Sequence, residues 1–413
     1  MLLSFRRVGL ARLFAIATLA GIVVAGCAQP APPPPPPPPV VEAPPPIPED
    51  PPAPNPLNRD QASFLRLPGT PDGVTPVRIG IILPLSSTNA GTRALAQSML
   101  KAAQLAMFDA NNPSMVLMVE DEGNGGAPAA AAARRLLAQG SEVIVGPLFA
   151  ASVNAVAPVT RDRGVPVLAF STEKSVAGRG IYLISFLPEN EVTRVVSFAA
   201  ERGHKRFAAL VPRNAYGTLA AEAMREAVSA AKGETVAVTE FAATAPGGQA
   251  AAREIGKSTL DALLIAQGGA VLRAMAPAIA GRDKTRLLGT GLWDEDALTR
   301  EAALDGGWYA APDPQASTAF TTKYRSTFGE APANIASLAY DAIALVALLA
   351  PGEPYKRFTK PILMDPNGFT GISGAFRFRM DGASERALAV LQMTPEGPQV
   401  ISPAPKTFLR TGR

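Results

Sequence analysis

Residues 77–87 read VRIGIILPLSS. A short, nearly continuous apolar run that is rich in isoleucine and stops at a proline and two serines is typical of a strand buried on both faces of a parallel sheet. A polar loop over 86–91 follows, and apolar residues then recur at helical spacing over 95–108. The stretch therefore predicts a unit of strand, loop and helix.

The same unit recurs along the chain. Further apolar runs that end in polar or glycine-containing loops lie at 143–148, 165–170, 207–212, 262–266 and 286–289. We also expect strands at 115–119 and 235–241, a crossing strand at 182–186, helices at 129–139, 191–202 and 336–349, and a hairpin of 374–380 with 387–393. Strands that alternate with helices predict an α/β fold with mostly parallel sheets.

The strands fall into two series of similar spacing. From 77 to 143 to 165 the steps are 66 and 22 residues, and from 206 to 262 to 286 they are 56 and 24 residues. A chain of 413 residues is long enough for about two domains. Two lobes of like topology are therefore predicted.

The composition excludes several classes of protein. The net charge of +4 includes Arg6, Arg7 and Arg12, which lie in a leader without acidic residues. Without them Lys+Arg falls from 39 to 36 against 35 acidic residues, a net charge of +1, so we expect no nucleic-acid partner. One Cys excludes an internal disulfide framework or thiolate zinc site, and one His excludes a multi-histidine metal site. We predict neither a metal nor a cofactor.

The N-terminus carries the features of an export signal. Residues 1–26 have a basic start and an apolar stretch over 13–24, which predicts a secretory signal peptide. A transmembrane anchor is the alternative, but the stretch is short of about 18 residues. It ends in VAGC at 24–27, which resembles the bacterial lipobox, so we expect Cys27 to be diacylated rather than simply buried. Because Ala28 follows instead of aspartate, this resemblance favours anchoring at the periplasmic face of the outer membrane.

A linker over 27–75 follows the leader. Residues 30–56 hold 17 of the 41 prolines. Such a segment cannot build a core and adopts polyproline II. It would act as a semi-rigid spacer of up to roughly 80 Å, or else as a ligand for a proline-binding domain. In either case the folded region, 76–404, is held away from the membrane.

The loops after the strands hold the candidate site residues, because ligands of open α/β sheets bind beyond the carboxyl ends of the strands. We expect these side chains to face a cleft between the lobes, with Trp293 lining it rather than lying in the core. The candidates from these loops are Ser86, Ser87, Leu148, Phe149, Ser152, Ser171, Thr172, Tyr216, Gln267, Trp293 and Asp294.

No catalytic motif is present in the sequence. There is no G-x-S-x-G elbow, and the glycine-rich loop 123–126 lacks the Lys-Ser/Thr of a phosphate loop. The single histidine, His204, is expected to face solvent near the end of a helix. The acidic runs at 121–122 and 294–296 are expected to form caps or solvated turns, with a cation or ammonium contact in the cleft as the alternative. We therefore predict a protein that is not an enzyme.

Four segments in order carry a resemblance to a known family. VRIGIILPLS, IVGPLFAASVNAVAPVTRDRGVPVLAFST, HKRFAALVPRNAYG and GFTGISGAFRFRMDG resemble type I periplasmic binding proteins of the leucine/isoleucine/valine-binding branch, over about residues 77–395. The lipobox, proline linker and GPLF sequence look most like penicillin-binding protein activators, the Lpo-type lipoproteins. The resemblance implies two lobes joined by three crossings, one lobe formed by 77–187 and 312–370 and the other by 188–311 and 371–404.

The resemblance also implies roles for particular residues. Amino-acid binders of the family hold the ligand carboxylate with hydroxyl groups after the GP strand, but here that loop reads Leu148-Phe149-Ala150-Ala151 and the nearest hydroxyl belongs to Ser152. Tyr216 matches the family's aromatic residue in the second lobe. Asp294 is the candidate to hold a ligand ammonium group. The best-known activators carry a helical-repeat domain where this chain has only its linker.

The function that the resemblance implies is contact-based. We expect a non-catalytic outer-membrane lipoprotein that binds and activates a bifunctional penicillin-binding protein, a peptidoglycan synthase, with an amino acid or peptide as a possible cleft ligand. The alternative is the solute-binding component of an ABC transporter for amino acids or small peptides. An enzyme of this fold is the third hypothesis.

Overall fold

The computed structural model describes residues 64–68, 76–255, 259–280, 284–295 and 297–408. All of them belong to one compact unit, Pro54–Arg413. The expected signal peptide, Cys27 and the proline run of the linker lie outside the described residues. In the described part of the chain, no helix is both long and apolar enough to span a bilayer.

The first sheet has the strand order β1-β3-β2-β4-β5-β6. All of its neighbouring strands are parallel except β1, which runs antiparallel to β3. Its strands are β1 Phe64–Arg66, β2 Val77–Leu83, β3 Met115–Asp121, β4 Val143–Val145, β5 Val167–Ala169 and β6 Ile181–Leu183. The expectation that residues 27–75 are linker throughout is therefore wrong at 64–66, because Leu65 packs on the first hydrophobic core and its strand extends the sheet edge.

The second sheet has the order β16-β15-β11-β10-β9-β7-β8. Its parallel part, β8-β7-β9-β10-β11, repeats the order β3-β2-β4-β5-β6 of the first sheet. Its strands are β7 Arg206–Pro212, β8 Glu234–Phe241, β9 Ala262–Ile265, β10 Arg286–Gly289, β11 Trp308–Ala311, β15 Ala389–Gln392 and β16 Gln399–Ser402. The predicted α/β fold with two lobes of like topology is confirmed.

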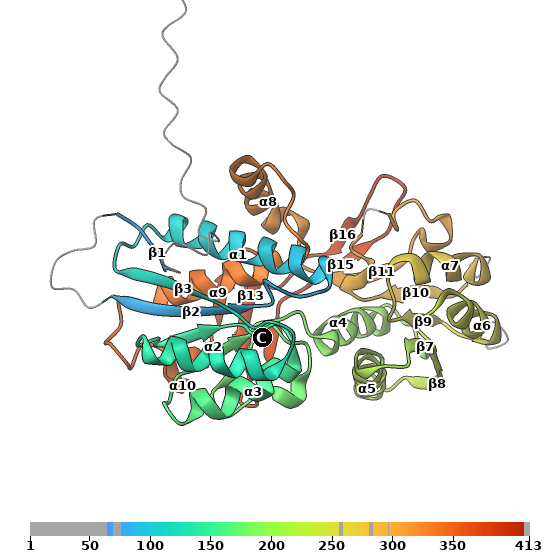
Figure 1. Cartoon of the computed structure of the whole chain (residues 1–413). Coiled ribbons are helices and arrows are strands. Elements are labelled where there is room, and N and C mark those ends of the chain that lie inside the picture. Colours follow the sequence, from blue (N-terminus) through green and yellow to red (C-terminus); the bar gives the residue numbers. More distant parts are fainter. Residues whose placement is uncertain (1–63, 69–75, 256–258, 281–283, 296, 409–413) are drawn as a thin grey trace, which may run out of the picture. The chain divides into compact units, whose positions relative to one another are not determined.

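Helices cover both faces of each sheet. In the first lobe, Ile79, Ile81 and Leu83 of β2 face the core that contains α1 and α9, whereas Ile82 faces the core that contains α2 and α3 (Figure 1). In the second lobe, α4 and α5 cover one face and α6 and α7 the other. The helices are α1 Ala90–Ala110, α2 Gly126–Ala138, α3 Ala150–Arg161, α4 Pro188–Glu201, α5 Ala215–Ala230, α6 Ala245–Ile255, α7 Gly269–Ile279, α8 Pro314–Phe328, α9 Ala336–Leu349 and α10 Lys360–Leu363, and the short 3₁₀ turns are η1 Lys174–Val176, η2 Gly291–Trp293 and η3 Ala302–Leu304.

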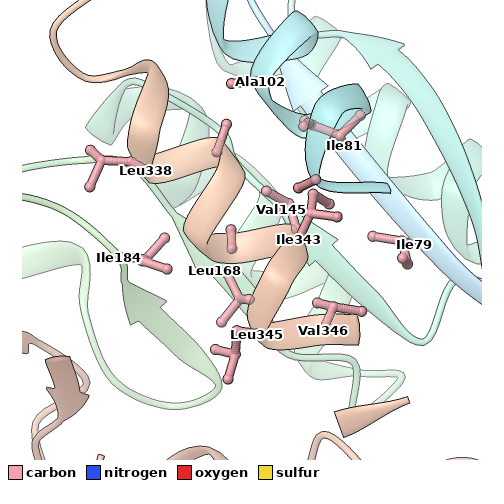
Figure 2. Packing of buried hydrophobic residues seen from close by; sticks show 14 of the residues in the cluster. Ile79, Ile81, Ala102, Val145, Leu168, Ile184, Leu338, Ile343, Leu345 and Val346 are labelled. Atoms are coloured by element: carbon pink, nitrogen blue, oxygen red, sulfur yellow. The ribbon is translucent and has the colours of Figure 1, made fainter. Parts of the chain in front are cut away.

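Helix α9 is the central element of the first core. It is apolar on nearly all sides, as expected of a helix that is buried rather than amphipathic. Figure 2 shows Ile343 of α9 beside Val145 of β4, and Ile81 of β2 and Leu168 of β5 belong to the same cluster. Burial of each such side chain contributes about 1.5–3 kcal/mol, so this helix fixes the layer above the sheet.

The C-terminal segment differs from the predicted hairpin. A third sheet has the order β12-β13-β14, formed by β12 Phe369–Gly371, β13 Gly374–Phe378 and β14 Ser384–Arg386. The predicted second arm, 387–393, instead contains β15, which pairs antiparallel with β11 of the second sheet. Phe376 and Phe378 pack in the first core. The chain therefore enters the second lobe after Arg386, rather than at 371, because aromatic side chains hold 369–378 on the first lobe.

Two of the chain crossings between the lobes are tied together by Arg386. Its Nε donates to the carbonyl of Ser185, in the segment between β6 and α4, at 3.2 Å. Its Nη1 donates to Asp341 Oδ2 of α9 at 3.3 Å, and both side chains of this ion pair are fully buried. Ile372 N donates to Asp341 Oδ1 at 2.7 Å. The predicted crossing strand at 182–186 is only partly a strand, since β6 ends at Leu183 and pairs with β5.

Candidate functional site

A cavity of about 350 Å³ opens at the carboxyl ends of the strands. This size is within the usual range for small-molecule sites. Residues of both lobes line it, namely Leu95, Leu148, Phe149, Ala150, Phe170, Ser171, Thr172, Glu173, Ser185, Phe186, Ala215, Tyr216, Leu219 and Ile335. We refer to this cavity as the cleft pocket.

Strand ends place most of this lining. Leu148 and Phe149 follow β4 and precede α3, and Ser171 and Thr172 follow β5. Tyr216 lies in the first turn of α5, after β7. In the first sheet the chain adds β3 on one side of β2 and then β4 on the other side, so the strand order switches between β2 and β4. The second sheet switches in the same way between β7 and β9. Open α/β sheets leave a crevice for ligands at such switch points. Five predicted residues thus meet in one cavity: Leu148, Phe149, Ser171, Thr172 and Tyr216.

Hydroxyl groups of the cleft pocket are engaged within the protein. Ser171 Oγ accepts from Glu173 N at 3.1 Å, and Ser185 Oγ donates to the carbonyl of Phe170 at 3.1 Å. Tyr216 Oη donates to Thr290 Oγ1 at 2.8 Å. Burial raises the pKa of Tyr216 well above its ordinary value, so the phenol stays neutral. The hydroxyl protons of Ser185 and Tyr216 are therefore used within the protein, whereas Ser171 Oγ acts in its bond only as an acceptor.

The first serine loop serves its own helix. Ser87 Oγ accepts from Asn89 N at 3.3 Å, and Asn89 in turn caps α1 by accepting from Thr92 N. Ser86 N donates to Asp121 Oδ1 at 3.2 Å. Neither Ser86 nor Ser87 lines the cleft pocket. Asp121 also accepts from Gly123 N, which agrees with the turn role expected for it.

Trp293 lies in the core, so the expectation that it lines the cleft is wrong. Its side chain is fully buried, and its Nε1 donates to the carbonyls of Ile265 and Gln267 at 3.2 and 3.1 Å. The ring packs over Gly289, where any β-carbon would lie 2.2 Å from it. The position of Trp293 after a strand end did not predict its burial, because the space for its ring exists only where Gly289 has no side chain.

Gln267 and Asp294 also lie outside the lining of the cleft pocket. Gln267 Nε2 donates to the carbonyl of Gly268 at 3.0 Å. Asp294 Oδ1 accepts from Tyr309 Oη at 3.0 Å. Burial, together with the neighbouring Asp294 charge, raises the pKa of Tyr309 far above its ordinary range. Asp294 is thus committed to a tyrosine of its own lobe.

Ser152, a predicted cleft residue, does not line the cleft pocket but lies buried beside Glu122, a pairing that the sequence did not predict. Ser152 is 1% exposed and Glu122 is 0% exposed, although a solvated turn was expected for the glutamate. In the described part of the chain, neither Ser152 Oγ nor the Glu122 carboxylate makes a hydrogen bond of normal geometry. Burial raises the pKa of Glu122 to about 7, and weaker interactions with the Ser152 side chain and the Leu148 backbone oppose this rise. Glu122 therefore lies near the backbone of Leu148, which lines the cleft pocket.

Glu191 is a second buried acid near the site. Its Oε2 accepts from Gly291 N at 3.1 Å, next to the Thr290 that holds Tyr216. Burial raises the pKa of Glu191 to about 8, and Glu189 and Asp294 raise it further, while the bond from Gly291 opposes the rise. In the sequence, Glu191 stood out only by its place in the first turn of a helix, where acidic residues are common.

We expect the free energy of unfolding to fall as the pH rises from about 4.5 to about 7, because of Glu122. The unfolded chain loses this proton near pKa 4.5, whereas the folded chain keeps it up to about 7. The folded state therefore binds more protons in this window, so the stabilisation is complete below 4.5 and lost above 7. Each unit of pKa corresponds to about 1.4 kcal/mol, so the loss is on the order of 3 kcal/mol.

Urea unfolding at acidic and neutral-to-basic pH measures this effect. Glu122→Gln should flatten the pH dependence, whereas the exposed change Glu330→Gln should leave it as in the unmodified protein. Glu191 acts in the same direction up to about pH 8, so part of the slope remains in Glu122→Gln. Identical slopes for the unmodified protein and Glu122→Gln would contradict the prediction.

Comparisons with known proteins agree with this geometry. Residues 76–398 match the model of a family described as "Periplasmic binding protein". No curated protein matches the sequence. Within the described residues, no group of three or more His, Cys, Asp and Glu side chains could hold a metal ion.

Solved structures share the fold at low sequence identity. A putative branched-chain amino acid ABC transporter protein from Rhodospirillum rubrum is 18% identical, with a TM-score of 0.69, and the match covers 78% of this chain and 99% of that one. A branched-chain amino acid substrate-binding protein from Streptococcus pneumoniae, in complex with isoleucine, is 21% identical, with a TM-score of 0.60 and coverage of 79% and 100%. An R. palustris solute-binding protein in complex with benzoate is 15% identical, with a TM-score of 0.61 and coverage of 81% and 98%.

Proposed function

Because the chain belongs to the periplasmic binding protein family, we propose that it is a solute-binding protein that holds one small molecule in the cleft pocket. The observation that carries the proposal is the cavity of about 350 Å³, which loops of both lobes line at the strand ends. Binding there needs no chemistry, in keeping with a family whose members bind solutes rather than transform them. The similar solved structures include ABC transporter proteins with isoleucine and benzoate bound, which supports this proposal.

The proposed function implies a partner, and the N-terminal sequence suggests a location. A solute-binding protein delivers its ligand to a membrane permease, so we propose the permease of an ABC transporter as its partner. Lipidation at Cys27 would anchor the chain, and the proline-rich linker would give the folded unit a reach of up to roughly 80 Å. With Ala28 after the cysteine, the sequence favours the outer membrane, from which the linker would have to bring the unit within reach of the permease.

A second function has its own support. The Ser185 and Tyr216 hydroxyls donate their protons within the protein, and Ala150 and Ala151 stand where amino-acid binders have hydroxyls. Together with the lipobox and the linker, this favours activation of a peptidoglycan synthase by surface contact. Such activation requires tighter binding to the active state of the synthase than to its inactive state.

Replacing Phe149 with alanine should weaken solute binding by about tenfold, because a partly exposed ring that lines the pocket is lost. Phe108→Ala is the matched control, since that ring is 52% exposed, close to the 46% of Phe149, and does not line the pocket. Calorimetry against a panel of amino acids, small peptides and aromatic acids measures the affinities.

One outcome would contradict the site, and another would contradict solute binding itself. Equal affinities for Phe149→Ala and Phe108→Ala would place the ligand elsewhere. If no solute of the panel binds, while the protein captures a bifunctional penicillin-binding protein and raises its crosslinking of lipid II, the activator function replaces solute binding.

A further inference from the structure

The lining of the cleft pocket carries a single formal charge. Glu173, in the loop after β5, is its only carboxylic acid, and no Lys, Arg or His is among the lining residues. Glu173 Oε1 accepts from Ser175 Oγ at 3.1 Å, which leaves Oε2 for another partner. An anionic solute would therefore enter a largely apolar cavity that offers it no countercharge, and such desolvation is costly.

Cations that neighbour the lining residues are engaged elsewhere. Lys174, which follows Glu173 in the chain, pairs with Asp381 Oδ2 at 3.2 Å. Arg93, two residues from Leu95 of the lining, donates through Nη1 to the carbonyls of Ser87 and Thr88. Arg386 contacts the ring of Phe186, with its guanidinium carbon 4.8 Å from the ring centroid, but its charge is matched by Asp341. Neither arginine lines the cleft pocket.

One feature would favour an anion, and an internal acid offsets it. Helix α3 begins at Ala150 in the pocket lining, and the cap residue Phe149 gives no side-chain hydrogen bond to its first turn. The positive end of a helix dipole attracts carboxylates. However, the buried carboxyl of Glu122 lies at this end, beside the Leu148 backbone and the Ser152 side chain. When Glu122 is ionised, its negative charge therefore opposes the attraction of this helix end for a ligand carboxylate.

We propose that the cleft pocket selects small apolar solutes that bear a positive charge and rejects carboxylates, with Glu173 as the counter-ion at its rim. This inference rests on the proposed function, because it assigns the ligand class of the same site. It separates this chain from a binder of free amino acids, whose carboxylate would have to be accommodated.

Three ligands of one size and shape test the charge directly. Benzylamine, benzyl alcohol and benzoate carry the same ring with a positive, neutral and negative group at neutral pH. Calorimetry with the full-length protein should show benzylamine binding about tenfold or more tighter than benzoate, with benzyl alcohol between them. Ligand-observed NMR competition, with benzylamine displaced from the protein, shows that all three share one site.

Two variants assign the effect to its residues. Glu173→Gln, an exposed change, should weaken benzylamine roughly three- to fivefold and leave benzyl alcohol unchanged. Glu122→Gln should strengthen benzoate roughly threefold at about pH 8.5, where Glu122 is ionised, and leave it nearly unchanged at about pH 6, where Glu122 keeps its proton. Thermal melting shows that both variants are folded.

The outcomes separate the inference from the proposed function. Benzoate binding as tightly as benzylamine, or more tightly, would overturn the charge selection and leave solute binding intact. Loss of benzylamine and benzyl alcohol affinity to the same extent in Glu173→Gln would also overturn it. No binding of any of the three ligands, nor of any solute in the wider panel, would remove both.

Discussion

Replacing Asp341 with asparagine is expected to lower the free energy of unfolding by about 3–5 kcal/mol, the usual effect of removing one member of a buried ion pair. Asparagine keeps the shape of the side chain and an oxygen for Ile372 N, so the change isolates the charge. Arg386 would then carry an uncompensated charge in a site where both side chains are 0% exposed. Urea unfolding gives the free energy directly.

Two further variants make this test specific. Glu330→Ala breaks an ion pair with Lys101 whose side chains are 34% and 53% exposed, and it should cost less than about 1 kcal/mol. The double variant Asp341→Asn with Arg386→Met removes the stranded charge, so it should recover most of the loss. If Asp341→Asn costs no more than Glu330→Ala, this ion pair does not stabilise the junction of the lobes.

Gly146→Ala should be nearly as damaging, with an expected loss of about 2–5 kcal/mol. Gly146 follows β4 with φ +85, and a β-carbon there would lie 2.1 Å from the carbonyl oxygen of Ile82 in β2. A left-handed conformation alone costs an alanine about 1–2 kcal/mol, and the collision with the backbone adds about 1–3 kcal/mol or more. Relief of the clash requires β2 and β4 to separate.

Gly203→Ala is the matched control for Gly146→Ala. Gly203 has φ +92, but a β-carbon added there would meet nothing within 4 Å. It should therefore lose only the conformational part, about 1–2 kcal/mol. Because residues 147–150 lead directly into the cleft pocket, Gly146→Ala should also weaken solute binding, whereas Gly203→Ala should not. Equal losses of stability in the two variants would show that the close approach to Ile82 is not the cause.

The two results bear on function in different ways. The Asp341–Arg386 pair lies where the segment before α4 meets β14, so its loss affects how the lobes are joined. Gly146 lies at the strand switch point of one lobe, so its change affects the loop that carries Leu148 and Phe149. Comparing the solute affinity of the two variants with their stability separates a damaged junction from a damaged pocket wall.

Local sequence patterns predicted most of the strands and helices in their order along the chain. Apolar runs such as 77–83 and 336–349 predict that these segments are buried, because the spacing of apolar residues can be read from neighbouring positions alone. The strand-end rule then brought Ser171, Thr172 and Tyr216 to one cavity, since parallel strands end at the same edge of a sheet. Missing catalytic and metal motifs are likewise a property of the sequence alone.

The contacts of each strand-end side chain, by contrast, depend on the tertiary structure. Trp293 is buried because Gly289 leaves room for its ring, and because its Nε1 donates hydrogen bonds to the carbonyls of Ile265 and Gln267. No local sequence pattern predicts these contacts. Glu122 lies on a loop whose sequence is typical of a solvated turn, yet the folded chain buries it completely. The segment at 387–393 joins the second sheet because β11 offers an unpaired edge. Such outcomes depend on contacts between residues far apart in the chain, whose geometry is set by packing of whole elements.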